Sequence, residues 1–325
     1  MFSRNELAKH VNPAPVLLIG YNRPEKMETL ISSLAVNKPK NLLVCVDGPK
    51  NNREGDREKV ERTRDCINQI RWDCKVQTLF RETNLGLQQS VVGAVDWAIS
   101  EFGSVVVLED DIQPGKQMLP YAWSMLENYR SDNLIGHISL YNNVPKQFLL
   151  ENNFHSRISR FPESYCWATW ERSWCNYDDS LSWGLNAPLS ELATRAGGLA
   201  GALKWRLNFM DASKGRIQTW AYRWLASLWA NNQFALAPNE NLGSYSGWSD
   251  GTHTFRKPKF KEQPVSHLDF GQLTSSSVLI NLSEDSEKYL SKEVFGESIS
   301  GILEGIAASF AMEIRDSYKK IHSRT

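Results

Sequence analysis

The sequence lacks an excess of charge of either sign, a long apolar run and a CxxC cysteine pair. Its 37 Lys and Arg balance 37 Asp and Glu, so it lacks the basic excess typical of proteins that bind duplex nucleic acid. No apolar stretch reaches the ~18 residues of a membrane-spanning helix, and the run at 16–20 is too short for a signal peptide core. We therefore expect a cytoplasmic protein that does not bind nucleic acid.

The five cysteines are odd in number and show no paired spacing, which argues against a disulfide framework and against a zinc site. We expect free, mostly buried thiols at Cys45, Cys66, Cys74, Cys166 and Cys175. Apolar residues make up 41% of the chain and charged residues 23%, as in an ordinary globular protein. The 325 residues suit two domains, or one large α/β domain with an appendage.

Short apolar runs alternate with helical patterns over the first 110 residues. Strands are expected at 15–20, 42–46, 75–80 and 104–108, the first of them buried. The helices expected between them begin at Pro24 and cover 53–70 and 85–100. Strands and helices that alternate at this pitch predict an α/β fold with a mostly parallel, Rossmann-like sheet flanked by helices.

Ligands of such sheets bind at the carboxyl ends of the strands. Four polar groups follow the expected strands, namely Gly20–Arg23, Asp47–Gly48, Arg81–Gly86 and Glu109–Asp111. Because the carboxyl ends of parallel strands meet at one edge of a sheet, we expect these groups to form one binding rim.

The second half of the chain is rich in tryptophan, with nine of the 12 Trp between residues 160 and 250. Core packing explains such a cluster, and so does a carbohydrate site, because a sugar ring presents an apolar C–H face to an indole. A helix near 118–129, a strand near 135–140, a Trp-rich helix from 219 to about 231 and a loop over 239–253 are also expected.

The acidic triplet Glu109-Asp110-Asp111 is the sharpest feature of the sequence, because it directly follows the apolar run at 105–108. Adjacent carboxylates repel one another, so a cation or hydrogen-bond donors must offset their charge. Oxygen ligands suit Mg²⁺ and Mn²⁺, and Mg²⁺ typically binds one or two carboxylates together with substrate phosphates. The triplet therefore predicts a divalent-metal site that a nucleotide diphosphate completes.

Five sequence blocks in this order resemble the GT-A-fold glycosyltransferases that use nucleotide sugars. The resemblance is to bacterial transferases of surface polysaccharides such as O-antigen and capsule, and more distantly to N-acetylglucosaminyltransferases with an EDD motif. It covers roughly residues 14–255. The blocks are VLLIGYNRPEKMETLISSL, LLVCVDG, RETNLGLQQSVVGAVDWAISEFGSVVVLEDDI, SYCWATWERSW, and TWAYRWLAS followed by PNENLG and DGTHT.

The resemblance implies a role for each matching residue. Asp111 and His253 would bind Mn²⁺ or Mg²⁺, and Glu109 and Asp110 would hold the ribose or metal-bound water. The nucleotide pocket of a UDP-sugar would be lined by Gly20, Tyr21, Asn22, Arg23, Asp47, Asn84 and Gly86. The acceptor side would be shaped by Trp167, Trp170 and Trp220.

The resemblance also implies a division of the chain. Residues 1–130 would form the donor-binding half of a GT-A domain, and residues 131–255 the Trp-rich half that binds the acceptor. A polar linker over 256–286 and an amphipathic helix over 287–325 would follow. The apolar stripe of that helix could dock on its own chain, on a second copy in a homodimer, or on the inner face of the cell membrane.

A catalytic base is needed if the anomeric carbon is inverted. The distant relatives carry an Asp before the late Trp-rich helix, but residues 217–222 contain no acid. Asp250 and Glu163 are the candidates, and a solvated loop acid is the alternative reading of each. A retaining mechanism stays open.

The predicted activity is transfer of a sugar from a nucleotide donor to a hydroxyl of a glycan or lipid-linked glycan acceptor in surface polysaccharide synthesis. A catalytically inactive GT-A protein that binds nucleotide sugar or glycan is the alternative. A dehydrogenase would need GxGxxG after the first strand, and a sugar-nucleotide pyrophosphorylase a Gly-rich basic loop there. Gly20-Tyr-Asn-Arg-Pro24 matches neither.

Overall fold

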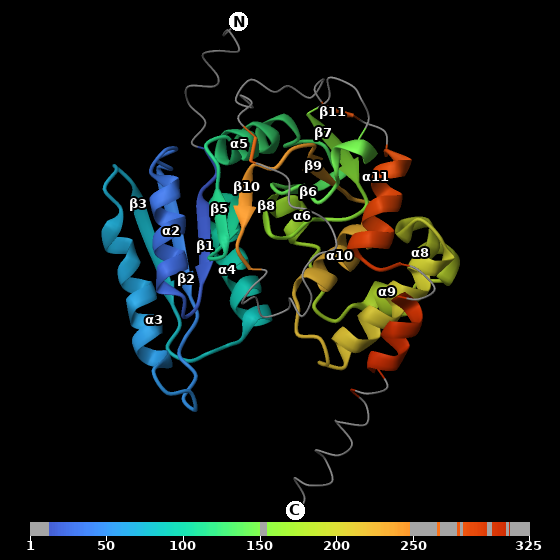
Figure 1. Cartoon of the computed structure of the whole chain (residues 1–325), viewed down its shortest axis with the longest axis horizontal. Helices are drawn as coiled ribbons and strands as arrows, with labels where there is room; N and C mark the ends of the chain where they lie inside the picture. Colours follow the sequence, from blue (N-terminus) through green and yellow to red (C-terminus); the bar gives the residue numbers. More distant parts are fainter. Residues whose placement is uncertain are drawn as a thin grey trace, which may run out of the picture.

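A computed structural model describes residues 13–149, 155–247, 265–266, 278–279, 282–297, 301–309 and 312. Its centre is a nine-stranded sheet with the order β11-β7-β9-β6-β8-β4-β1-β2-β3 (Figure 1). The strands are β1 Val16–Gly20, β2 Asn41–Val46, β3 Lys75–Phe80, β4 Ser104–Glu109, β6 Ile135–Ser139, β7 Ser156–Ser159, β8 Cys166–Trp170, β9 Phe234–Pro238 and β11 Val278–Leu279. A small second sheet pairs β5 Ile112–Pro114 with β10 Gly243–Tyr245.

The helices of the first half lie close to their predicted positions. They are α2 Pro24–Leu34, α3 Asp56–Asp65 with a 3₁₀ turn at Cys66–Gln69, α4 Leu87–Phe102 and α5 Met118–Asn128. Pro24 occupies the first turn of α2, where its missing N–H costs no hydrogen bond. Strands β1, β2, β3 and β4 are mutually parallel, so the α/β architecture predicted from the sequence is confirmed.

Side chains of the central strands alternate between the two faces of the sheet, and both faces are covered. Val16 and Leu18 of β1 join one core with Met27 and Leu30 of α2. Leu17 points to the opposite face, where α4, α6 Glu171–Trp174 and α10 Ala221–Ala230 contribute the apolar side chains. Burial on both faces is why the strands appear in the sequence as continuous apolar runs.

The sheet is mixed beyond β4. Strand β8 runs antiparallel to both β4 and β6, and β7 runs antiparallel to β9. One correction concerns the stretch 239–253, which is predicted as a loop but contains β10. Gly243 pairs with Pro114 of β5, and this pairing makes a strand of a segment whose small and polar residues are typical of a loop.

The tail does not form the single helix predicted over 287–325. Helix α11 begins at Glu284 and ends at Tyr289, a π-helical turn follows at Leu290–Val294, and the chain is non-helical around Gly296, which has a φ of +66°. A further helix covers 301–309. The predicted linker over 256–286 lies largely outside the described residues.

The described part of the tail docks on its own chain. Helices α7 Ser182–Asn186, α8 Leu189–Ala196 and α9 Leu199–Ser213 form a third core with the segment around Leu290 and Phe295 (Figure 1, right side). Ser309 Oγ donates to Asp211 of α9 at 2.8 Å, and the Lys204 ammonium reaches the Gly301 carbonyl at 3.4 Å.

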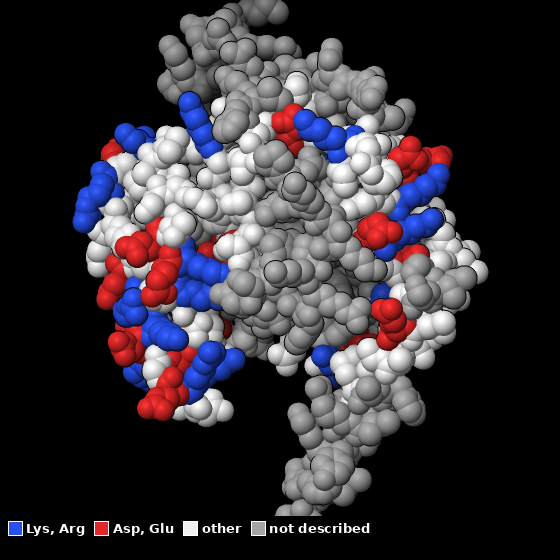
Figure 2. Space-filling model, viewed as in Figure 1, with Lys and Arg blue, Asp and Glu red and all other residues white. Residues whose placement is uncertain are grey.

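All five cysteines are unpaired, and Cys45, Cys66 and Cys166 are buried, as predicted. Acidic and basic side chains interleave over the face shown in Figure 2, which agrees with the balanced composition. Within the described residues, every helix is too short or too polar to cross a bilayer.

Candidate active site

The predicted binding rim forms at the carboxyl ends of β1, β2 and β4. Strand β1 lies between β2 and β4, with Gly20 opposite Val46 and Ile19 opposite Glu109. The residues that follow these strands therefore emerge side by side. The structure in this way brings Gly20–Arg23, Asp47 and Glu109–Asp111 together from segments far apart in the sequence.

Arg23 is the cation that faces the acidic triplet. Its guanidinium lies 3.1 Å from Asp110 Oδ1 and 3.6 Å from Asp111 Oδ2, and both aspartates are only 8% exposed. Burial raises the pKa of Asp110 to about 6, although the positive charge of Arg23 opposes the increase. Burial, followed by repulsion from Asp111 and Asp110, raises the pKa of Glu109 well above its usual range.

The donor set at this position suits a hard divalent cation. Asp110 and Asp111 present carboxylate oxygens, and the described residues add no third His, Cys, Asp or Glu placed to complete a metal cluster. Mg²⁺ commonly binds one or two carboxylates and fills its remaining positions with water and substrate phosphate. The residues present therefore fit a metal that is shared with a phosphate-bearing ligand.

The segment after β10 starts directly beside Asp111. Ser246 donates to the Asp111 carbonyl from its backbone N–H at 2.8 Å and from its hydroxyl at 3.0 Å. The next residue, Gly247, is so close that a Cβ atom there would lie 2.7 Å from Asp111 Oδ2. Asp250 and His253 lie outside the described residues, so their predicted roles stay predictions.

Asp56, the first residue of α3, organises the side chains that follow β1. The Tyr21 hydroxyl donates to its carboxylate in a short hydrogen bond, and Asn22 Nδ2 and the Lys50 backbone N–H donate at 2.6 and 2.8 Å. Burial alone would raise the pKa of Asp56, but these donors outweigh it and lower that pKa. Sequence reasoning missed Asp56, because a single acid at a helix start carries no motif.

Asp47 fixes the turn that precedes α4. Its carboxylate accepts hydrogen bonds from the N–H groups of Leu85 and Gly86 at 2.9 and 3.1 Å, and from Asn84 Nδ2 at 3.0 Å. The adjacent Gly48 packs so tightly that a Cβ atom would lie 2.3 Å from the Thr83 backbone. Asp47 therefore holds the N-terminus of α4 at the rim, where unpaired helical N–H groups favour an anion.

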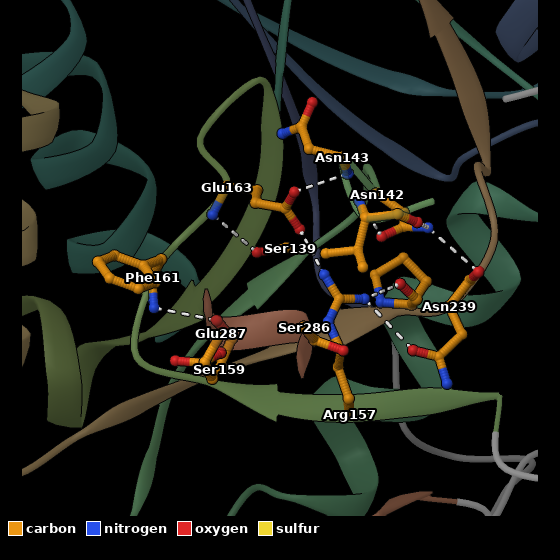
Figure 3. A network of polar contacts seen from close by, with 12 residues as sticks. Ser139, Asn142, Asn143, Arg157, Ser159, Phe161, Glu163, Asn239, Ser286 and Glu287 are labelled. Carbon is orange, nitrogen blue, oxygen red and sulfur yellow. Dashed lines mark hydrogen bonds and ion pairs between the residues drawn. The ribbon is translucent and has the colours of Figure 1, made fainter. Parts of the chain in front are cut away.

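Glu163 lies in a buried network between β7 and the loop after β6 (Figure 3). Its carboxylate accepts from the Asn143 backbone N–H at 2.8 Å and lies 3.2 Å from the Arg157 guanidinium, with both side chains 1% exposed. Burial raises the pKa of Glu163, and Arg157 opposes the increase. In this arrangement both carboxylate oxygens of Glu163 are engaged by protein donors.

A family model described as "Glycosyl transferase family 2" matches residues 16–192, more than half of the chain. The chain belongs to this family. The match runs from β1 into α8 and includes the rim, Asp56, Asp110 and Asp111. It supports a GT-A-like fold and glycosyltransferase activity with a nucleotide-sugar donor and a glycan acceptor. No curated protein matches the chain significantly.

The tryptophans predicted for the acceptor side of this family 2 enzyme lie in its core. Trp167, Trp170 and Trp220 are 0%, 4% and 2% exposed. Trp167 stacks on Trp220 with ring centroids 5.0 Å apart, and Trp170 Nε1 donates to the Leu126 carbonyl at 3.0 Å. None of these three rings offers an open face for a sugar in this conformation, so the contacts account for them as core packing.

Proposed function

We propose that the chain is a metal-dependent glycosyltransferase that moves a sugar from a nucleoside diphosphate donor, a UDP-sugar, to a hydroxyl of a glycan or lipid-linked glycan acceptor. The observation that carries this proposal is the buried Asp110–Asp111 pair at the end of β4, beside Arg23 and the end of β1. Surface polysaccharide synthesis is the process to which the sequence resemblance points.

Asp111 and Asp110 would hold the cation, and a metal bound there would stabilise the negative charge that develops on the departing nucleoside diphosphate. Arg23 offsets the charge of the two carboxylates and adds a fixed positive charge next to the diphosphate position. Tyr21 and Asn22, locked by Asp56, would form one wall of the nucleotide pocket. Asp47 would act mainly by holding the turn at Asn84–Gly86.

Asp250 is the better candidate for a catalytic base, if the reaction inverts. A base must reach the acceptor hydroxyl. Glu163 already accepts hydrogen bonds on both oxygens. Asp250 comes three residues after Gly247, where an added Cβ atom would lie 2.7 Å from Asp111 Oδ2. Asp250→Asn should slow sugar transfer at least tenfold, and Glu163→Gln should act mainly on stability.

We also propose two halves of the domain with different ligands. Residues 1–130, which carry the rim, would bind the donor, and residues 131–255 would bind the acceptor. Leu303 and Ile306 of the tail are 61% and 48% exposed, which supports contact of this helix with a membrane face or with a second copy.

The alternative function is a GT-A protein that binds nucleotide sugar or glycan without turnover. The hydrogen bonds that Glu163 accepts on both oxygens are compatible with it, because they leave this carboxylate unsuited to act as a base.

A thermal-shift screen of UDP-, GDP-, CMP- and dTDP-sugars with and without Mn²⁺ tests the proposal. A ligand at 100 times its Kd adds about 2.7 kcal/mol of stability. A shift that requires both one nucleotide and Mn²⁺ supports the site, and no shift with any pair contradicts it. Mn²⁺-dependent hydrolysis of the donor then separates an enzyme from a binding protein.

A further inference from the structure

We propose that a cavity between the segment before β8, the start of α10 and the segment after α11 is a subsite for one neutral pyranose ring of the acceptor. The proposal rests on the proposed glycosyltransferase function. The cavity has a volume of about 190 Å³. This is below the ~300 Å³ at which pockets for drug-sized ligands begin, so it suits one ring rather than an oligosaccharide.

The walls of the cavity are aromatic, and a few polar groups lie among them. Tyr165, Tyr222 and Phe295 supply partly exposed ring surface, and Asn143 and Glu163 supply polar atoms. Trp205 also lines the cavity but is only 1% exposed. An apolar wall fits the C–H face of a pyranose, and a few placed polar groups fix its orientation. Trp205, Tyr222 and Phe295 lie beyond the family match at 16–192, so this wall is particular to the rest of the chain.

Asn143 supplies the observation that points to a ligand. The residue is 3% exposed, and its side-chain oxygen Oδ1 has no hydrogen-bond partner among the described residues. Buried polar atoms are normally paired, so this acceptor lacks the partner that such atoms usually have. In Figure 3 the oxygen of the Asn143 amide points away from Glu163 and Arg157. An oxygen so placed calls for a donor, which a sugar hydroxyl or an acetamido N–H provides.

The charge state of the cavity favours a neutral ring over an ion. Glu163 is the ionisable carboxylate in the wall, and Arg157 already pairs with it at 3.2 Å. The pair leaves no uncompensated charge to attract a cation or an anion.

One tyrosine connects the cavity to the metal site. Tyr165 lies in the cavity wall, and its ring centroid is 4.7 Å from that of Tyr245. Tyr245 pairs with Ile112, the residue after Asp111. A ring in the cavity would therefore lie on the acceptor side of the donor site, separated from Asp111 by this pair of aromatic side chains.

Saturation-transfer NMR with methyl glycosides of hexoses, N-acetylhexosamines and 6-deoxyhexoses tests the assignment, with and without UDP and Mn²⁺. Val294→Trp fills the cavity from its partly exposed wall, and Glu293→Trp adds the same ring at an exposed neighbour outside the wall. We expect at least one glycoside class to bind, Val294→Trp to weaken binding at least tenfold, and Glu293→Trp to leave it unchanged. If Val294→Trp does not fold, Ala221→Leu fills the cavity from the opposite wall.

Two results would overturn the assignment, namely no glycoside signal under any condition, or equal binding by the wild type and the cavity-filling variant. Titration of UDP and Mn²⁺ into the same wild-type sample keeps this inference separate from the proposed function. Nucleotide binding without glycoside binding rejects the cavity alone. Glycoside binding that Val294→Trp removes, in a protein that binds no nucleotide, retains the cavity as a sugar site and rejects the transferase.

Discussion

The guanidinium of Arg23 lies 3.1 Å from Asp110 Oδ1. This ion pair connects the segment that follows β1 to the acidic triplet at the end of β4. Arg23 also lies 3.6 Å from Asp111. A fixed cation therefore compensates two adjacent, largely buried carboxylates, at the position where the proposed metal would contribute further positive charge.

Arg23→Met removes this compensation and keeps the length of the side chain. The Arg23 side chain is 24% exposed, so solvent screens part of the loss, and we expect a destabilisation of about 1–3 kcal/mol in metal-free buffer. Mn²⁺ should raise the melting temperature of this variant more than that of the wild type, because it restores positive charge to the pair. Arg62→Met, which breaks an exposed pair with Glu25, is the control and should leave stability nearly unchanged. Equal effects of Mn²⁺ on the variant and the wild type would contradict the metal site.

Asp47→Ala should loosen the turn before α4. The change leaves the N–H groups of Leu85 and Gly86 without their acceptor in a partly buried turn, and a hydrogen bond to a charged group contributes roughly 1.5–3 kcal/mol. We expect the free energy of unfolding in urea to fall by about 2–4 kcal/mol. Asp73→Ala removes an acid whose side chain is 93% exposed and should leave stability nearly unchanged. Similar losses in the two variants would show that Asp47 does not hold the turn.

Tyr21 and Asp56 should be energetically coupled. A hydrogen bond to a charged group contributes roughly 1.5–3 kcal/mol, so Tyr21→Phe is expected to destabilise the protein by about this amount. In a double-mutant cycle with Asp56→Asn, the coupling free energy should be about 1 kcal/mol or more. Additive effects of the two substitutions would argue against this hydrogen bond as the support of the nucleotide wall.

Glu297 predicts a pH dependence of stability. Burial raises its pKa to about 7, although Ser291 and Trp205 donate hydrogen bonds to its carboxylate. Its pKa in the unfolded chain is near 4.5. The folded state therefore retains a proton between these values, so the contribution of Glu297 to stability falls as pH rises from about 4.5 to 7.

The size of that effect is on the order of 2–3 kcal/mol. Glu297→Gln should remove this part of the pH slope in urea unfolding measured from pH 4.5 to 8. Glu293→Gln, at an exposed position of the same segment, should retain the slope. An unchanged slope in Glu297→Gln would contradict the shifted pKa.

Much of the donor side could be predicted from the sequence because its signals are local. The segment 75–80 is strand β3, Pro24 opens α2, and the rim follows from the parallel order of β1, β2 and β4. The acidic triplet could be recognised as a candidate site from the sequence alone, because three adjacent carboxylates directly after a buried strand are unusual.

The rest depends on contacts between distant residues, which the sequence does not display. Asp56 reaches Tyr21 across 35 residues, and Asn143 pairs with Glu163 across 20. The run Cys166–Trp170 is a central antiparallel strand, although the sequence resemblance implied an acceptor-side role for Trp167 and Trp170. Aromatic composition alone does not distinguish a tryptophan in the core from one in a cleft, since both depend on packing.

The central claim is that Asp111 binds a metal that also binds the donor diphosphate. Calorimetric titration of UDP, or of the nucleotide with the largest thermal shift, into the wild type and Asp111→Asn with and without Mn²⁺ tests it most directly. Ser246 binds the backbone carbonyl of Asp111, so the substitution leaves that contact in place. We expect tight binding only by the wild type with Mn²⁺, and at least tenfold weaker binding by Asp111→Asn, or about 1.4 kcal/mol. Equal affinity and equal Mn²⁺ dependence in the two proteins would contradict the account.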